Sequence, residues 1–216
     1  MFNTIISNLP HLINAVGPVI AKVATNIVTK LPEIARTIVK IAEVISEVAN
    51  ILGLTDHETP EVIGAKIQQE GTRTRFEDES IEEYLDYLRE EIKVDKEKML
   101  NMSEEERIKC TAVGIGALSE YISEKFNVTF YGDFIVDMYK MQMSAKEIAS
   151  YVKKFENDGI SSMDSLSDFL KGKLTDEERV SIYNTITEVE KEQNPQATQT
   201  DVNEKIESMK EALEAE

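Results

Sequence analysis

Residues 1–54 read MFNTIISNLPHLINAVGPVIAKVATNIVTKLPEIARTIVKIAEVISEVANILGL, a stretch made mostly of Ile, Val, Leu and Ala. Residues that are polar or that punctuate helices recur in it every three or four positions, at Asn3, Ser7, His11, Asn14, Pro18, Lys22, Thr25, Thr29, Glu33, Arg36, Lys40 and Glu47. The steps repeat with a period of eleven residues, which is close to the pitch of a straight α-helix. The pattern predicts helices with one narrow polar stripe and apolar side chains on most other sides.

The prolines of this arm divide it into shorter helices. Proline is tolerated in the first turn of a helix but costs about 3 kcal/mol in a helix interior. We therefore expect two or three helices that break near Pro18 and Pro32. The alternative is that Pro32 kinks one continuous helix.

An arm this apolar needs a cover, because a surface helix cannot leave so much apolar area in water. Burying a dozen large aliphatic side chains at roughly 1.5 to 3 kcal/mol each gives tens of kcal/mol of gross driving force. The cover can be the chain's own body, a second copy, a partner or lipid. We expect the docking or oligomerisation face to consist of Ile20, Val23, Ile27, Leu31, Ile34, Ile38, Ile41, Ile45, Val48 and Leu52.

Composition and charge limit the classes of function. The chain has 216 residues, of which 41% are hydrophobic and 30% charged, as in folded helical proteins. Its net charge is −17, yet residues 1–54 carry +1, so the remaining residues carry −18. An acidic body repels phosphate backbones, and we therefore expect no nucleic-acid partner.

Start and stop signals predict an all-α fold with helices throughout the remaining chain. Ser103, Ser144 and Thr175 are each followed three residues later by Glu, as in capping boxes. Asp78 or Ser80 is expected to cap the helix that follows residue 80, and Gly53 predicts the end of the last arm helix. We expect an apolar arm over 1–54, a connector with a short helix over 55–76, an acidic helical body over 77–194, and a linker with a C-terminal amphipathic helix over 195–216. Residues 127–133 are the one place that favours a short extended segment.

The middle of the predicted helix over 104–126 is small and apolar, and it contains Gly114 and Gly116. Each glycine destabilises a helix by roughly 1 kcal/mol relative to alanine. A close helix crossing would explain why they are there.

No catalytic, cofactor-binding or metal-binding constellation is recognisable in the sequence. Cys110 lies in an apolar helical run, which predicts a buried core residue. Asp56, His57, Glu58 and Glu61 cluster after the arm, but their spacing matches no metal-ligand motif. We expect a protein that is not an enzyme and has no cofactor, while the sequence leaves small-molecule ligands undetermined.

A phrase repeats within the arm at an offset of twenty-two residues. Ser7-Asn8-Leu9-Pro10-His11-Leu12-Ile13 corresponds to Thr29-Lys30-Leu31-Pro32-Glu33-Ile34-Ala35. This phrase, followed by helix rich in Ile, Val and Ala, resembles the apolar repeats of phage tape-measure and contractile-injection proteins, over about a quarter of the chain. The resemblance implies a structural or cargo component of a phage-like particle or injection machine.

Together these features predict a helical assembly protein whose arm binds a protein partner or another copy of itself, in the cytoplasm or on a particle. The alternative is a membrane-active or membrane-surface protein, toxin-like or peripheral, that inserts the arm into a bilayer after export without a cleavable signal peptide. In a third interpretation the arm folds back onto the body as core.

Overall fold

The computed structural model describes residues 18–29, 34–54, 58–70, 79–130 and 133–215. The fold is all-α, as predicted, with no strand among these residues. After a helix over 18–29 come α2 (Ile34–Ile51), α3 (Pro60–Glu70), α4 (Ile81–Glu91), α5 (Lys96–Leu100), α6 (Glu104–Phe126), α7 (Phe134–Lys140), α8 (Ala145–Asp158), α9 (Asp164–Leu170), α10 (Asp176–Gln193) and α11 (Gln199–Glu214).

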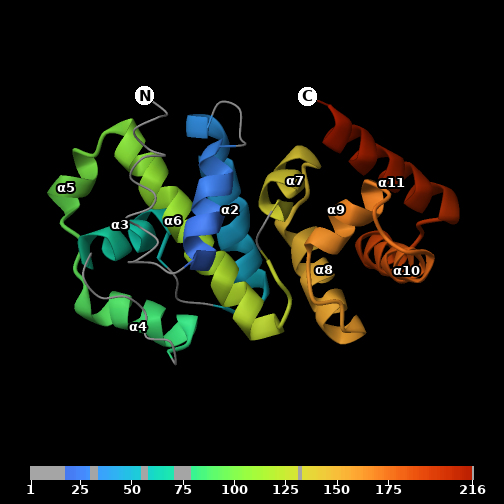
Figure 1. The fold of residues 1–216 in the computed structure, drawn as a ribbon, viewed down its shortest axis with the longest axis horizontal. Helices are drawn as coiled ribbons and strands as arrows, with labels where there is room; N and C mark the ends of the chain where they lie inside the picture. The colour runs from blue at the N-terminus through green and yellow to red at the C-terminus, as the bar shows by residue number, and fades with distance from the viewer. Residues whose placement is uncertain (1–17, 30–33, 55–57, 71–78, 131–132, 216) are drawn as a thin grey trace.

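The helix α6 runs through the middle of the first group of helices (Figure 1). It packs against α2, α3, α4 and α8. Every residue from Cys110 to Ser119 is buried, although this run has no amphipathic pattern. A helix that is apolar on all sides is stable only when neighbours cover it on all sides, and that is the position of α6.

The two glycines of α6 lie where other segments approach its backbone closely. A Cβ atom at Gly114 would lie 1.8 Å from the carbonyl oxygen of Pro60, and one at Gly64 of α3 would lie 1.8 Å from that of Cys110. At Gly116 the nearest atom would be the carbonyl oxygen of Ile20, at 2.9 Å. The predicted close crossing is confirmed, with α3 as the partner helix.

Helix ends follow the local signals. Full capping boxes join Ser80 to Glu83, Ser103 to Glu106 and Thr175 to Glu178. Gly53 adopts a φ of +80° after α2, and the N–H of Leu54 donates to the carbonyl of Ala49. This is a Schellman ending, which favours glycine because its backbone is left-handed there.

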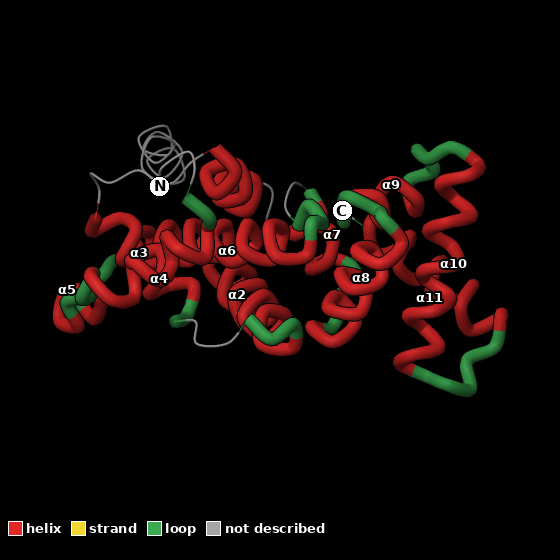
Figure 2. The backbone as a smooth tube through the Cα atoms, turned by 90° about the horizontal axis from the view of Figure 1, so that it is seen from below, coloured by secondary structure: helices red, strands yellow, loops and turns green. Residues whose placement is uncertain are grey.

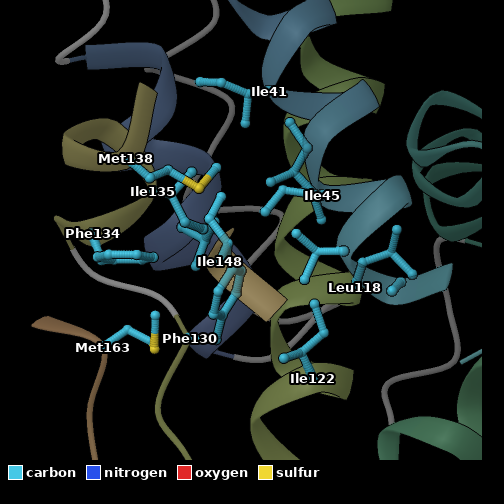
Figure 3. Packing of buried hydrophobic residues seen from close by; sticks show 14 of the residues in the cluster. Ile41, Ile45, Leu118, Ile122, Phe130, Phe134, Ile135, Met138, Ile148 and Met163 are labelled. Atoms are coloured by element: carbon cyan, nitrogen blue, oxygen red, sulfur yellow. The ribbon is translucent and has the colours of Figure 1, made fainter. Parts of the chain in front are cut away.

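The second half of the chain forms a further group of short helices, with α10 and α11 at the far end from α5 (Figure 2). Here α11 contacts α7, α9 and α10 and buries Val202 and Met209. The C-terminal helix is therefore docked on its own chain. Phe130, Phe134, Met138, Met141 and Met143 join the same core as α2 and α6, as Figure 3 shows for Phe130, Phe134 and Met138.

The predicted extended segment is reduced to one isolated parallel bridge between Thr129 and Ser162. The N–H of Thr129 donates to Ser161, and its carbonyl accepts from Met163. Residues 131 and 132 lie outside the described ranges.

Candidate functional site

The structure places the expected docking residues inside the protein. Eight of them are at most 9% exposed and belong to one continuous core: Ile20, Val23, Ile27, Ile38, Ile41, Ile45, Val48 and Leu52. Leu31 and the side chain of Ile34 lie outside what the structure describes. Since α2 packs on α6 and α8, this face is covered by the chain itself and is not exposed to a partner. The third interpretation, in which the arm folds back as core, accounts for this burial.

The opposite face of α2 is open to solvent. Val39 is 51% exposed and Ile51 is 38% exposed, and both are among the large apolar side chains that the described surface exposes most. Val39, Glu43 and Glu47 follow one another at four-residue spacing, which places them on one side of the helix. The outward face of α2 therefore combines an apolar side chain with carboxylates.

A groove lies between this face and the start of α3. We call it the acidic groove, because the described residues that line it include three glutamates and no basic side chain. Its volume is about 440 Å³, and its lining residues are Val39, Ala42, Glu43, Ser46, Glu47, Asn50, Thr59, Pro60, Glu61 and Thr111. Glu61 forms an ion pair with Arg107 at 3.0 Å, so Glu43 and Glu47 are the carboxylates that remain for an outside partner.

A larger groove lies on the other side of the start of α3, bounded by the end of α4 and by α5. We call it the basic groove, because four basic side chains and one carboxylate line it in a chain of net charge −17. Its volume is about 750 Å³, and its lining residues are Glu58, Val62, Lys66, Arg89, Ile92, Lys93, Val94, Lys96, Met99 and Leu100. Leu100 is 79% exposed, the largest value among the exposed large apolar side chains of the described residues.

Two of the basic side chains already have partners within the fold. The Lys66 side chain is only 4% exposed, and its ammonium lies 2.7 Å from the Glu58 carboxylate. Arg89 pairs with Asp86 at 3.1 Å. Lys93 and Lys96 form no ion pair with any described residue, so they are the charges that this groove presents to a ligand.

A third, polar cavity of about 380 Å³ joins the helix over 18–29 to α7 and α9. Its lining residues are Lys22, Asn26, Asp133, Asp137, Asp164, Ser167, Asp168, Lys171 and Lys173. Lys171 pairs with Asp137 at 2.6 Å, and Asp164 accepts a hydrogen bond from the Phe134 N–H at 3.0 Å. The hydrogen bond joins the starts of α7 and α9, and the ion pair joins the end of α9 to the middle of α7.

Asp164 gives a prediction about the dependence of stability on pH. Burial raises the pKa of its carboxyl group, and Asp133, Asp168 and Asp137 raise it further, against the hydrogen bond from Phe134. A raised pKa means that this group stabilises the fold most below the pKa of the unfolded chain, and that this stability is lost as the pH rises through the pKa of the folded state. We expect Asp164→Asn, which keeps the acceptor for Phe134, to raise the Tm at pH 7 but not near pH 3.

Thermal unfolding by circular dichroism at the two pH values checks this. Asp86→Asn is the matched control, because that half-exposed carboxylate pairs with Arg89 at 3.1 Å and is not among the charges that act on Asp164, so its replacement should not raise the Tm. An equal rise at both pH values would contradict the electrostatic explanation.

Cys110 is the single cysteine, and the structure confirms that it is buried in the core. Burial, followed by the nearby Glu61 carboxylate, raises the pKa of its thiol to about 11, while Gln68 donates a hydrogen bond to the sulfur at 3.1 Å. At pH 8 we expect the native thiol to react with a disulfide reagent at least about 100-fold more slowly than in denaturant. Spectrophotometric titration of the thiol measures both rates, and equal rates would contradict the burial.

Of the four residues considered for a metal, the structure describes Glu58 and Glu61, and each is paired with a basic side chain. Glu58 pairs with Lys66 and Glu61 with Arg107, while Asp56 and His57 lie outside the described ranges. Across the part of the chain that the structure describes, no group of three or more His, Cys, Asp or Glu side chains is placed to hold a metal ion. Among the described helices, none combines the length and the apolar character that crossing a bilayer requires.

Sequence reasoning missed both grooves. Residues 92–100 contain a recognisable signal, because the basic residues Lys93, Lys96 and Lys98 interrupt an otherwise acidic body and flank Met99 and Leu100. What the sequence does not contain is the packing of this segment beside α3. Comparisons of the chain with protein families, with curated proteins and with solved structures found no match.

Proposed function

We propose that this chain is a helical assembly protein that acts by binding other proteins, and that its docking element is the outward face of α2. The observation that carries this proposal is that Val39 is exposed beside the acidic groove. The other face of the same helix is buried in the core, which holds α2 in place. A docking surface on a rigid helix needs little ordering when a partner binds, and this favours affinity.

The proposal assigns no reaction to the chain. The Cys110 thiol is held in its protonated form by its raised pKa, whereas a nucleophilic cysteine needs the thiolate. Glu83, Glu106 and Glu178 each accept hydrogen bonds from the residue that caps their own helix, which also lowers the pKa of each carboxyl group. These four side chains therefore have structural roles in the fold.

As the partner we propose another structural protein of a phage-like particle or injection machine, with this chain as a structural or cargo component. This rests on the repeated Leu-Pro phrase of residues 7–13 and 29–35, most of which lies outside the described ranges. The acidic composition supports the proposal further, since a net charge of −17 keeps a protein soluble until it binds a specific partner surface.

A site-specific photocrosslinker tests the docking element. We expect p-benzoylphenylalanine at position 39, introduced into the full chain in the cells that make it, to give one discrete crosslinked product on irradiation. The matched control is position 180 of α10, whose valine is 61% exposed and lines neither groove. Mass spectrometry identifies the crosslinked protein, and the expected result is a protein of the particle, a second copy of this chain included.

Two results would contradict the proposal. Crosslinking at position 39 that does not exceed that at position 180 would show that the outward face of α2 is not a docking surface. Co-flotation of the purified chain with lipid vesicles, with no protein crosslink, would support the membrane-surface alternative instead.

A further inference from the structure

We infer that a second copy of this chain docks on the two grooves: in a two-fold dimer, the basic groove of each copy receives the outward face of α2 of the other. The inference rests on the proposed function, and it names another copy as one of the proteins that the α2 face binds. The structure supports it through the position of the grooves, through their charge and through their exposed apolar side chains.

The two grooves flank the start of α3. Glu58 and Val62 line the basic groove, whereas Thr59, Pro60 and Glu61 line the acidic groove, so the start of α3 separates them. A two-fold axis near this point brings the basic groove of one copy opposite the acidic groove of the other, and it does so twice. Such isologous pairing buries the same patch on both copies and closes the assembly at two subunits.

The charges that remain after internal pairing are complementary. Lys93 and Lys96 on one side, and Glu43 and Glu47 on the other, have no ion pair with described residues, whereas Lys66, Arg89 and Glu61 are already paired. Two basic side chains therefore face two carboxylates in each half of the interface. Charge pairs of this kind select the partner and the register of an interface.

Each groove also carries an exposed apolar side chain for the other copy. Leu100 lines the basic groove and is 79% exposed, and Val39 lines the acidic groove and is 51% exposed. An unrelated basic or acidic partner would satisfy one groove only. A second copy supplies an apolar side chain and the complementary charges for both grooves.

Charge reversal tests the pairing in the full chain. We expect sedimentation equilibrium at physiological ionic strength to show the mass of two chains at high protein concentration and of one chain on dilution. K93E/K96E and E43K/E47K are each expected to weaken self-association by about 100-fold, since like charges then meet in both halves of the interface.

Mixing the two variants is the decisive measurement. In the mixed dimer, the acidic side chains introduced in K93E/K96E lie opposite the basic side chains introduced in E43K/E47K. The unchanged Glu43 and Glu47 of the first variant lie opposite the unchanged Lys93 and Lys96 of the second. The mixture should regain the dimer mass, while each variant alone stays monomeric with unchanged helical content by circular dichroism. Recovery of masses above two chains would overturn the two-fold geometry.

Further results would overturn the inference in different ways. A wild-type chain that keeps the mass of one chain at every concentration, or a mixture that fails to recover, would exclude the second copy as the occupant. If position 39 nonetheless crosslinks to a different protein in cells, the proposed docking function stands and only the self-pairing is rejected.

Discussion

Gly114→Ala is expected to destabilise the protein by at least about 3 kcal/mol, although the same change in an ordinary helix interior stabilises by roughly 1 kcal/mol. The added Cβ atom would lie 1.8 Å from the Pro60 carbonyl oxygen, 2.5 Å from its carbon and 2.7 Å from its Cα atom. All three are backbone atoms, so no side chain can rotate away. Relief requires α3 to move by more than about 1 Å from α6, and a close-packed core resists such a movement.

The other two glycines of the crossing are expected to be sensitive to the same substitution, Gly64 as strongly as Gly114 and Gly116 less strongly. Gly64→Ala meets the Cys110 backbone at 1.8 Å and should be as severe as Gly114→Ala. Gly116→Ala meets Ile20 at 2.9 to 3.1 Å, partly through a side-chain methyl group, and should be milder. Urea unfolding followed by circular dichroism measures all three, and equal stability of Gly114→Ala and wild type would contradict the close crossing.

Ile45→Ala is expected to destabilise the isolated chain by about 3 kcal/mol, because removing buried methyl groups leaves a cavity in a core that collapses only partly. Ile45 is fully buried in α2 and faces the core that Ile41, Leu118 and Ile122 share (Figure 3). In a chain of this length the loss corresponds to a fall in Tm of about 6 to 12 °C. Differential scanning calorimetry of the purified chain measures it.

Val39→Ala on the same helix is the matched control. Its side chain is 51% exposed, so its truncation should change the free energy of unfolding by no more than about 0.5 kcal/mol. If α2 were an arm detached from the body, both substitutions would leave the unfolding of the body unchanged. Equal effects of the two substitutions would therefore contradict the core position of α2.

Most helix boundaries could be predicted because their causes are local. Ser103 and Glu106 form a capping box within four residues, and Gly53 ends α2 through hydrogen bonds that reach back only five residues. Such contacts depend on the chain next to them, not on what packs above. The close crossing at Gly114 could also be predicted from local chemistry, because a glycine weakens a helix and is favoured inside one where another backbone approaches closely.

The candidate site could not be predicted in the same way. The eleven-residue pattern identified the apolar faces of the arm, but it could not indicate that α6 and α8 cover α2. A docking face was therefore expected where the structure has core, and the exposed Val39 on the other side of α2 was overlooked. The basic groove combines residues 58–66 with residues 89–100, which no periodicity in the chain connects.

The sequence by itself determined that the protein is helical, where most of its helices begin and end, and that its N-terminal quarter needs a cover. These properties follow from propensity, capping and apolar area, which neighbouring residues decide. Only the tertiary structure decided what the cover is and which side chains remain outside, because burial depends on contacts between residues far apart in the chain. The same apolar stripe serves as a core when α6 lies against it, and it would serve as an interface if α6 did not.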